Sequence, residues 1–400
     1  MRRKKPASGF FIAVVVIILY FILFPHPLGR ELVARPAWTL SLPAAESLPP
    51  GGRSPDSPAE AGRPDALQRP DALQRPDALQ RPDALQRPDA SERPDALQRP
   101  AAFQLGDTFG YVGPSGRLVH VEKTLFRVAL SEAGFVNYTR IGSDWVLRDP
   151  AGERLFSFAG RGYPMASGDG ARVFVVKTDL TGLQEVDRSG EVLWNRDFPS
   201  MLTSVSIEGD HLLAGLMDGS LELLDRTGAA VFTHATSGSR IPVILAAAVS
   251  SDGSRLACLC GIDPQVLTVL GKKGASFAET SRTLLSAEFR KEVRLLFSPD
   301  SRYLVLEGDG AAGLADPGSR ELSWTPLGGS LTGVSFLGRA RAAALLARGE
   351  SSWRLTIAAP LSSVLCAASF RATAAFLGSV DGQILLGIDG RLLRVDVEAM

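Results

Sequence analysis

The stretch Leu183–Phe232 contains one short phrase twice, first as LQEVDRSGEVLW (Leu183–Trp194) and then as LELLDRTGAAVF (Leu221–Phe232). Each copy consists of an apolar run, a turn of the form Asp-Arg-Ser/Thr-Gly, and a second run that ends on a large aromatic residue. Glycine adopts the positive φ of a tight hairpin without a Cβ clash, so Gly190 and Gly228 predict two hairpin turns.

The aspartates that open these turns, Asp187 and Asp225, lie 38 positions apart. Each carboxylate can accept hydrogen bonds from backbone N–H groups two residues later, which steadies the turn. One hairpin and two further strands fill such an interval, and four strands are the content of one blade of a β-propeller. The repeat therefore predicts an all-β fold, a β-propeller, and no helical periodicity is sustained that would favour an α-solenoid.

Turns of the same kind recur between residues 113 and 319 at spacings of 36 to 46 residues. A second turn type alternates with them, as in SGDG from Ser167 and SSDG from Ser250. About 300 residues at this spacing predict seven blades, with eight as the alternative. We expect the strands near Gln383 and Arg391 to lie beside the blade made by Phe109–Val121, which would close the ring and remove its free edges.

These motifs resemble the repeats of the pyrroloquinoline-quinone-type β-propellers, and the SPDS turn from Ser298 is similar to a turn of WD40-type blades. The resemblance implies structural roles for the Asp, Gly and aromatic positions of each blade. The residues that match are Asp187, Gly190 and Trp194, then Asp225, Gly228 and Phe232, and more weakly Asp149, Gly152 and Phe156. It is specific for the fold and weak for function.

Four segments follow from the composition. Residues 1–8 carry a basic cluster and are expected in the cytoplasm, and residues 9–28, apolar and without a charge, are expected to form an uncleaved transmembrane signal anchor. A cleaved signal peptide is the competing interpretation. The propeller is expected over residues 103–400, on the extracytoplasmic side of the inner membrane.

Between these segments, residues 29–102 are rich in proline and contain RPDALQ repeats with a period of six. Proline at every sixth position excludes a continuous helix, and one leucine per unit is too little to form a core. We therefore expect a disordered linker, a stalk that holds the propeller away from the membrane. A role of the repeats as a docking array is the alternative.

Charge and reactive side chains restrict the function. Acidic and basic residues are equal at 43 each, which argues against nucleic acid as a partner. Cys258, Cys260 and Cys366 are expected to be small buried residues, with a bond from either of the first two to Cys366 as the alternative. The histidines form no metal-spaced pair, and no catalytic motif is present, so we predict no cofactor, no metal and no enzyme activity.

The resemblance also implies alternatives. Quinone-dependent dehydrogenases of this repeat type use eight blades, a calcium ion and often adjacent cysteines, so an oxidoreductase or small-ligand propeller is one alternative and a structural spacer is another. Related propellers also occur in outer-membrane assembly factors, which carry lipid on a cysteine that this chain lacks. We expect a protein-interaction scaffold with an envelope protein as partner. Trp194, Trp324 and Trp353 are expected between blades, and Trp145 is a candidate for a partner contact on the rim.

Overall fold

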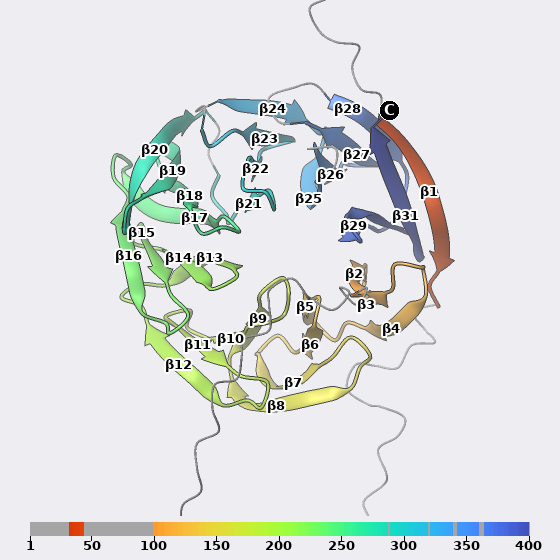
Figure 1. Ribbon diagram of the computed structural model, residues 1–400, viewed down its shortest axis with the longest axis horizontal. Coiled ribbons are helices and arrows are strands. Elements are labelled where there is room, and N and C mark those ends of the chain that lie inside the picture. Colours follow the sequence, from red (N-terminus) through yellow and green to blue (C-terminus); the bar gives the residue numbers. More distant parts are fainter. Residues whose placement is uncertain are drawn as a thin grey trace, which may run out of the picture.

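The computed structural model describes residues 32–43, 99–286, 289–318, 321–338, 342–359 and 364–399. Within these ranges the chain forms eight antiparallel sheets arranged around a central axis (Figure 1). Seven sheets have four strands and one has three. The expected all-β propeller is confirmed. Eight blades are present, so the alternative count is right and seven is wrong.

The strands follow the ring in chain order. The first half contains β2 (Ala101–Leu105), β3 (Thr108–Val112) and β4 (Leu118–Lys123); β5 (Arg127–Ser131), β6 (Gly134–Tyr138), β7 (Ser143–Arg148) and β8 (Arg154–Arg161); β9 (Tyr163–Ala166), β10 (Val173–Val176), β11 (Gly182–Val186) and β12 (Val192–Asp197); and β13 (Leu202–Glu208), β14 (His211–Leu216), β15 (Ser220–Leu224) and β16 (Ala230–Ala235).

The second half contains β17 (Ile241–Val249), β18 (Arg255–Ile262), β19 (Gln265–Lys273) and β20 (Ser276–Leu285); β21 (Leu295–Phe297), β22 (Leu304–Glu307), β23 (Ala311–Ala315) and β24 (Leu322–Pro326); β25 (Ser330–Leu337), β26 (Ala342–Arg348), β27 (Trp353–Ala358) and β28 (Val364–Phe370); and β29 (Ala375–Val380), β30 (Gln383–Ile388) and β31 (Arg391–Ala399). The blade of β29–β31 takes its outermost strand from the other end of the chain, β1 (Leu32–Ser41).

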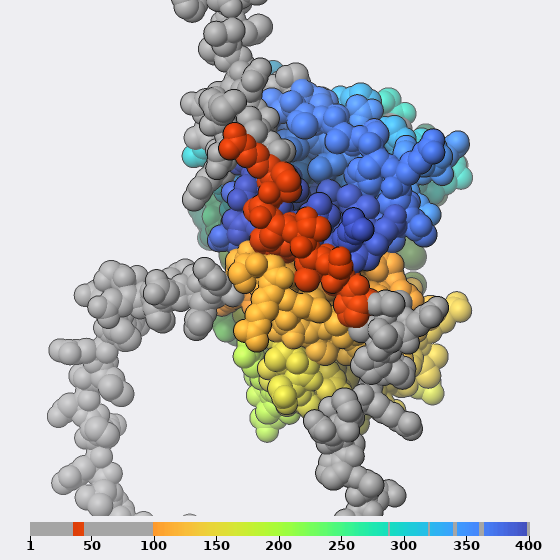
Figure 2. All heavy atoms as spheres, turned by 90° about the vertical axis from the view of Figure 1, so that its right-hand side faces the viewer, coloured from red at the N-terminus to blue at the C-terminus, as the bar shows by residue number. Residues whose placement is uncertain are grey.

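Strand β1 closes the ring and corrects the expected domain boundary. It pairs antiparallel with β31, from Leu32 opposite Ala399 to Ser41 opposite Arg391. In Figure 2 it crosses the side of the propeller, between the blue C-terminal strands and the orange strands that start at residue 101. Residues 32–41 therefore belong to the propeller and not to a linker. Pro36 fits there because an outermost strand leaves one edge without ladder partners.

The position of β1 also changes the expected role of the RPDALQ array. The array follows β1 and precedes β2, so it connects two strands of the propeller and does not separate the propeller from residues 9–28. The repeats themselves lie outside the described residues. Residues 9–28 do as well, and the described part of the chain contains no helix long and apolar enough to span a membrane.

The up-and-down order of the strands gives the propeller two different faces. The links from one blade to the next and the turns between second and third strands lie on one face, which we call the interblade face. The turns that contain Asp149, Asp187 and Asp225 join third to fourth strands and lie on the opposite face, which we call the Asp-turn face. The backbone bond from Leu42 N to Gly390 O places the end of β1 on the interblade face.

The start of β1 and the entry into β2 lie on the other face. Leu32 pairs with Ala399 at the end of β31, a third strand, and third strands end on the Asp-turn face. The chain enters each four-stranded blade from the interblade face. The blade of β2–β4 has three described strands, so the chain enters it from the Asp-turn face. The ion pair between Arg99 and Glu132, which follows β5, agrees with entry from the Asp-turn face (3.6 Å).

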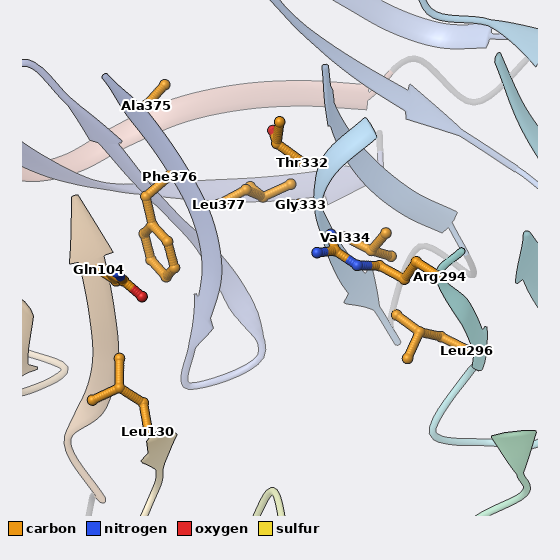
Figure 3. Close-up of a pocket in the computed structure, with 10 residues that line it drawn as sticks. All are labelled: Gln104, Leu130, Arg294, Leu296, Thr332, Gly333, Val334, Ala375, Phe376 and Leu377. Carbon is orange, nitrogen blue, oxygen red and sulfur yellow. The ribbon is translucent and has the colours of Figure 1, made fainter. Parts of the chain in front are cut away.

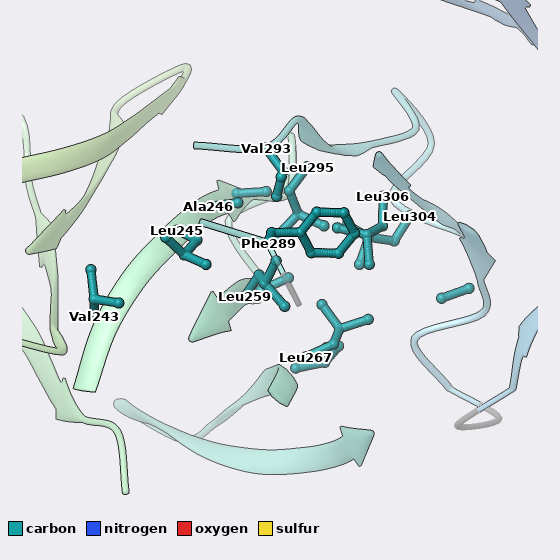
Figure 4. Packing of buried hydrophobic residues seen from close by; sticks show 14 residues of the cluster. Val243, Leu245, Ala246, Leu259, Leu267, Phe289, Val293, Leu295, Leu304 and Leu306 are labelled. Carbon is teal, nitrogen blue, oxygen red and sulfur yellow. The ribbon is translucent and has the colours of Figure 1, made fainter. Parts of the chain in front are cut away.

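The core lies between the blades. In the described residues, eight apolar clusters each join two neighbouring sheets. Figure 4 shows the cluster between β17–β19 and β21–β22, where the ring of Phe289 packs among Leu259, Leu304 and Leu306. The cluster that closes the ring joins Phe103 to Leu392 and to Trp38 of β1. Each blade is thus stabilised by burial against both neighbours.

Candidate functional site: the interblade face

The predicted hairpin turns have a common geometry on the Asp-turn face. Asp187 Oδ1 accepts hydrogen bonds from Ser189 N (2.8 Å) and Glu191 N (2.9 Å). Asp225 Oδ1 accepts the same bonds from Thr227 N (2.8 Å) and Ala229 N (3.1 Å). The Ser189 hydroxyl donates a further bond that contributes most to lowering the pKa of Asp187. One oxygen of each carboxylate thus holds its turn, as the sequence predicts for turn residues.

The aromatic residue of one blade packs on the turn glycine of the next. A Cβ placed on Gly228 would lie 2.5 Å from the ring of Trp194, and one on Gly190 would lie 3.1 Å from that of Phe156. Glycine is thus required twice at this position, for its positive φ and for the close approach of the ring. Phe232 departs from this pattern, because its ring meets Phe277 at 5.1 Å instead of a glycine.

The same contact occurs at two further blade junctions that the sequence analysis did not identify. Asp149 and Gly152 form the expected turn, and the ring that packs on Gly152 belongs to His120, at 2.7 Å from a Cβ placed there. Gly116 receives Trp38 in the same way, at 2.9 Å. The indole Nε1 of Trp38 also donates to the Pro114 carbonyl (2.8 Å).

A buried ion pair lies within the blade of β9–β12. Arg172 donates from Nε and Nη2 to the two carboxylate oxygens of Glu185, at 2.9 and 2.7 Å. The side chains are only 3% and 4% exposed. Trp194 Nε1 donates to the same carboxylate (2.7 Å), which links the ion pair to the aromatic contact between blades. This fork geometry satisfies the buried charges and argues for a structural role.

The other tryptophans do not all lie where the sequence suggested. Trp145 is 2% exposed and donates to the Gly162 carbonyl (3.1 Å), so the expected rim contact is wrong. Trp353 is buried and donates to the Ala372 carbonyl (2.9 Å), in the link to the next blade. Trp324 is 41% exposed and lies over Gly308 and Gly313 of its own blade. The burial of each tryptophan depends on the neighbouring strands and blades, so the sequence alone does not distinguish the buried Trp145 and Trp353 from the exposed Trp324.

The exposed large apolar side chains are distributed unequally between the two faces. Nine of them lie on outermost strands, and Leu296 lies in the channel. All the others in the described residues lie at the interblade face, where they belong to the first five blades. These are Leu125, Phe126, Ile141, Met201, Met217 and Ile241. The turns of the Asp-turn face carry none. Exposed apolar side chains that gather on one surface indicate an interaction site.

The loops that carry these side chains are held in place by hydrogen bonds. Asn137 accepts from Leu125 N (2.9 Å) and donates to the Lys123 carbonyl (2.9 Å). Met217 N donates to the Met201 carbonyl (2.8 Å), which joins the turn between β14 and β15 to the link between β12 and β13. Phe126 is 50% exposed. The guanidinium groups of Arg127 and Arg140 lie 5.8 and 5.9 Å from the centre of its ring. The surface is therefore formed before any partner binds.

The cysteines belong to the core. Cys258 and Cys260 are buried in the cluster between β13–β16 and β17–β20, with Leu256 and Val266 beside them. The described residues contain no group of three or more potential metal ligands. Cys366 is partly buried in β28, and all three thiols are free. The expected burial of the first two is confirmed, and no bond joins them to Cys366.

The described residues form an eight-bladed propeller with exposed apolar side chains on its interblade face. A family model described as "beta-propeller protein" matches residues 1–400, and the chain belongs to that family. An uncharacterized protein of Treponema pallidum (strain Nichols) is 22% identical over 293 residues, which are 73% of this chain and 77% of the relative.

Two solved structures have a similar fold. BamB from Moraxella catarrhalis aligns with a TM-score of 0.51 and 16% identity, over 75% of this chain and 97% of BamB. The computationally designed Ika8 protein aligns with a TM-score of 0.52 and 14% identity, over 74% of this chain and 96% of the design. At this identity the likeness concerns the fold alone.

Proposed function

We propose that this protein is an interaction scaffold that binds a protein partner through the interblade face of its first five blades. The observation that carries the proposal is the segregation of loop-borne exposed apolar side chains onto that face. Aromatic, methionine and arginine side chains are enriched in protein interfaces, and Phe126, Met217 and Arg140 supply one of each. The fold that the chain shares with BamB is compatible with such a role.

The proposal includes a position in the cell envelope. Residues 9–28 would act as a signal anchor, as their apolar composition predicts, with the propeller outside the cytoplasm. Only residues 29–31 separate that segment from β1, which spans at most about 10 Å. Because β1 starts on the Asp-turn face, that face would lie toward the bilayer. The interblade face would then point away from the membrane, open to an envelope protein.

Crosslinking in the native membrane tests this proposal. The double variant Phe126→Ser, Ile141→Ser should lose the crosslinked partner, since it removes apolar surface from the interblade face without affecting the core. The matched control is Val192→Ser, Val231→Ser, which removes exposed apolar surface from outermost strands and should keep the partner. Loss in the control alone would place the interface on the rim. A chain that crosslinks to no protein would favour the structural spacer instead.

A further inference from the structure

The central channel contains a pocket of about 420 Å³. Innermost strands of five blades and the residue before β21 form its wall (Figure 3). Much of the wall is apolar, from Leu130, Leu296 and Phe376. This size suits a small organic molecule.

One charged side chain, Arg294, lines this pocket. In Figure 3 it reaches into the space from one wall, and Gln104 lies on the opposite wall. Neither the guanidinium of Arg294 nor the amide of Gln104 has a hydrogen-bond or ion-pair partner within the described ranges. Glu307 accepts from the backbone N of Arg294 (3.1 Å), but its side chain pairs with Lys291 (3.7 Å). The positive charge is therefore not neutralised.

A guanidinium binds a carboxylate through two parallel hydrogen bonds, and an apolar wall strengthens that attraction by lowering the local dielectric constant. We propose that the channel pocket binds a small carboxylate with an apolar body, whose carboxylate pairs with Arg294. The apolar body would lie against Leu296 and Phe376, and Gln104 would bond to a polar group at the far end. The residues that line this pocket are not among the exposed apolar side chains proposed to bind the protein partner, so this inference does not depend on that role.

Fluorine NMR of para-(trifluoromethyl)benzoate with the full-length chain in amphipol tests the site. The neutral probe para-(trifluoromethyl)benzamide has the same shape and lacks the charge. We expect the benzoate signal to broaden at millimolar concentration and the benzamide signal to broaden much less. Arg294→Met should weaken benzoate binding roughly tenfold or more, since a charged hydrogen-bonded contact is lost.

Two variants keep the experiment decisive. Arg294→Lys keeps the charge but loses the fork, so it should bind benzoate with an affinity between those of the wild type and Arg294→Met. Arg302→Met removes an exposed arginine of the same blade that pairs with Asp300 and should bind like the wild type. The proposal is overturned if benzoate and benzamide bind equally, if neither binds, or if both Arg294 variants bind benzoate like the wild type.

Discussion

Replacing Trp38 by alanine should weaken the closure of the ring, where β1 packs on the blade of β2–β4. Truncating a fully buried tryptophan costs about 3–5 kcal/mol, so the partly buried Trp38 should cost about 2 kcal/mol. The lost bond from Nε1 to the Pro114 carbonyl adds about 1 kcal/mol. The cost of this lost hydrogen bond stays near 1 kcal/mol because the Pro114 carbonyl still accepts a hydrogen bond from Arg394 (3.3 Å) and is not left unsatisfied. The total is about 3 kcal/mol, a fall in melting temperature of about 5–10 °C.

Urea unfolding followed by far-ultraviolet circular dichroism measures this loss without relying on tryptophan fluorescence. Trp324→Ala is the matched control, because Trp324 is 41% exposed and packs only within its own blade; it should cost about 1 kcal/mol. Hydrogen exchange should also rise selectively in β31, which pairs with β1. Equal losses in the two variants, with unchanged exchange in β31, would refute the role of β1 as the strand that closes the ring.

Three further predictions concern the blades. Glu185→Ala should lower the free energy of unfolding by about 3–5 kcal/mol, since it leaves Arg172 buried and unpaired; urea unfolding of a double variant with apolar residues at both positions should show a much smaller loss. Gly228→Ala should destabilise by about 1–2 kcal/mol more than Gly209→Ala in the same assay, because both have a positive φ but only Gly228 meets a ring. Asp252 is exposed, and although its slight desolvation raises the pKa, hydrogen bonds from Ser250 and Ser254 lower the pKa from 3.8 to about 2. Its contribution is therefore complete above about pH 4 and lost as the pH falls toward about 2, so the stability difference between wild type and Asp252→Asn should shrink across that window, and a constant difference would contradict it.

The strands and hairpin turns within the blades could be predicted from the sequence. A glycine and an aspartate at fixed offsets are typical of hairpins, so Asp187, Gly190, Asp225 and Gly228 predict hairpin turns, which the structure places between third and fourth strands. The short apolar runs between these turns predict β-strands. The identity of the ring that packs on each turn was less accessible. His120 takes that place at Gly152, and an imidazole carries no signal of such a role in one sequence.

The blade count was misjudged because two blades are incomplete in sequence. The blade of β2–β4 contains three described strands, and that of β29–β31 borrows β1, so a count based on the length of a full repeat came out one too low. Strand β1 contains Pro36 and stands next to the proline-rich repeats, which made it look like a linker. The available signal was Trp38, which supplies the aromatic residue of an outermost strand, as Phe156 and Trp194 do in other blades.

The amino-acid sequence by itself determined the all-β architecture and the hairpin turns, because these depend on residues close together in the chain. Only the tertiary structure decided how the ring closes, which face carries the apolar side chains, and that Arg294 and Gln104 face each other across one channel. Those features join residues as far apart as Leu32 and Ala399, and no local rule of backbone geometry or side-chain pattern relates positions at that distance.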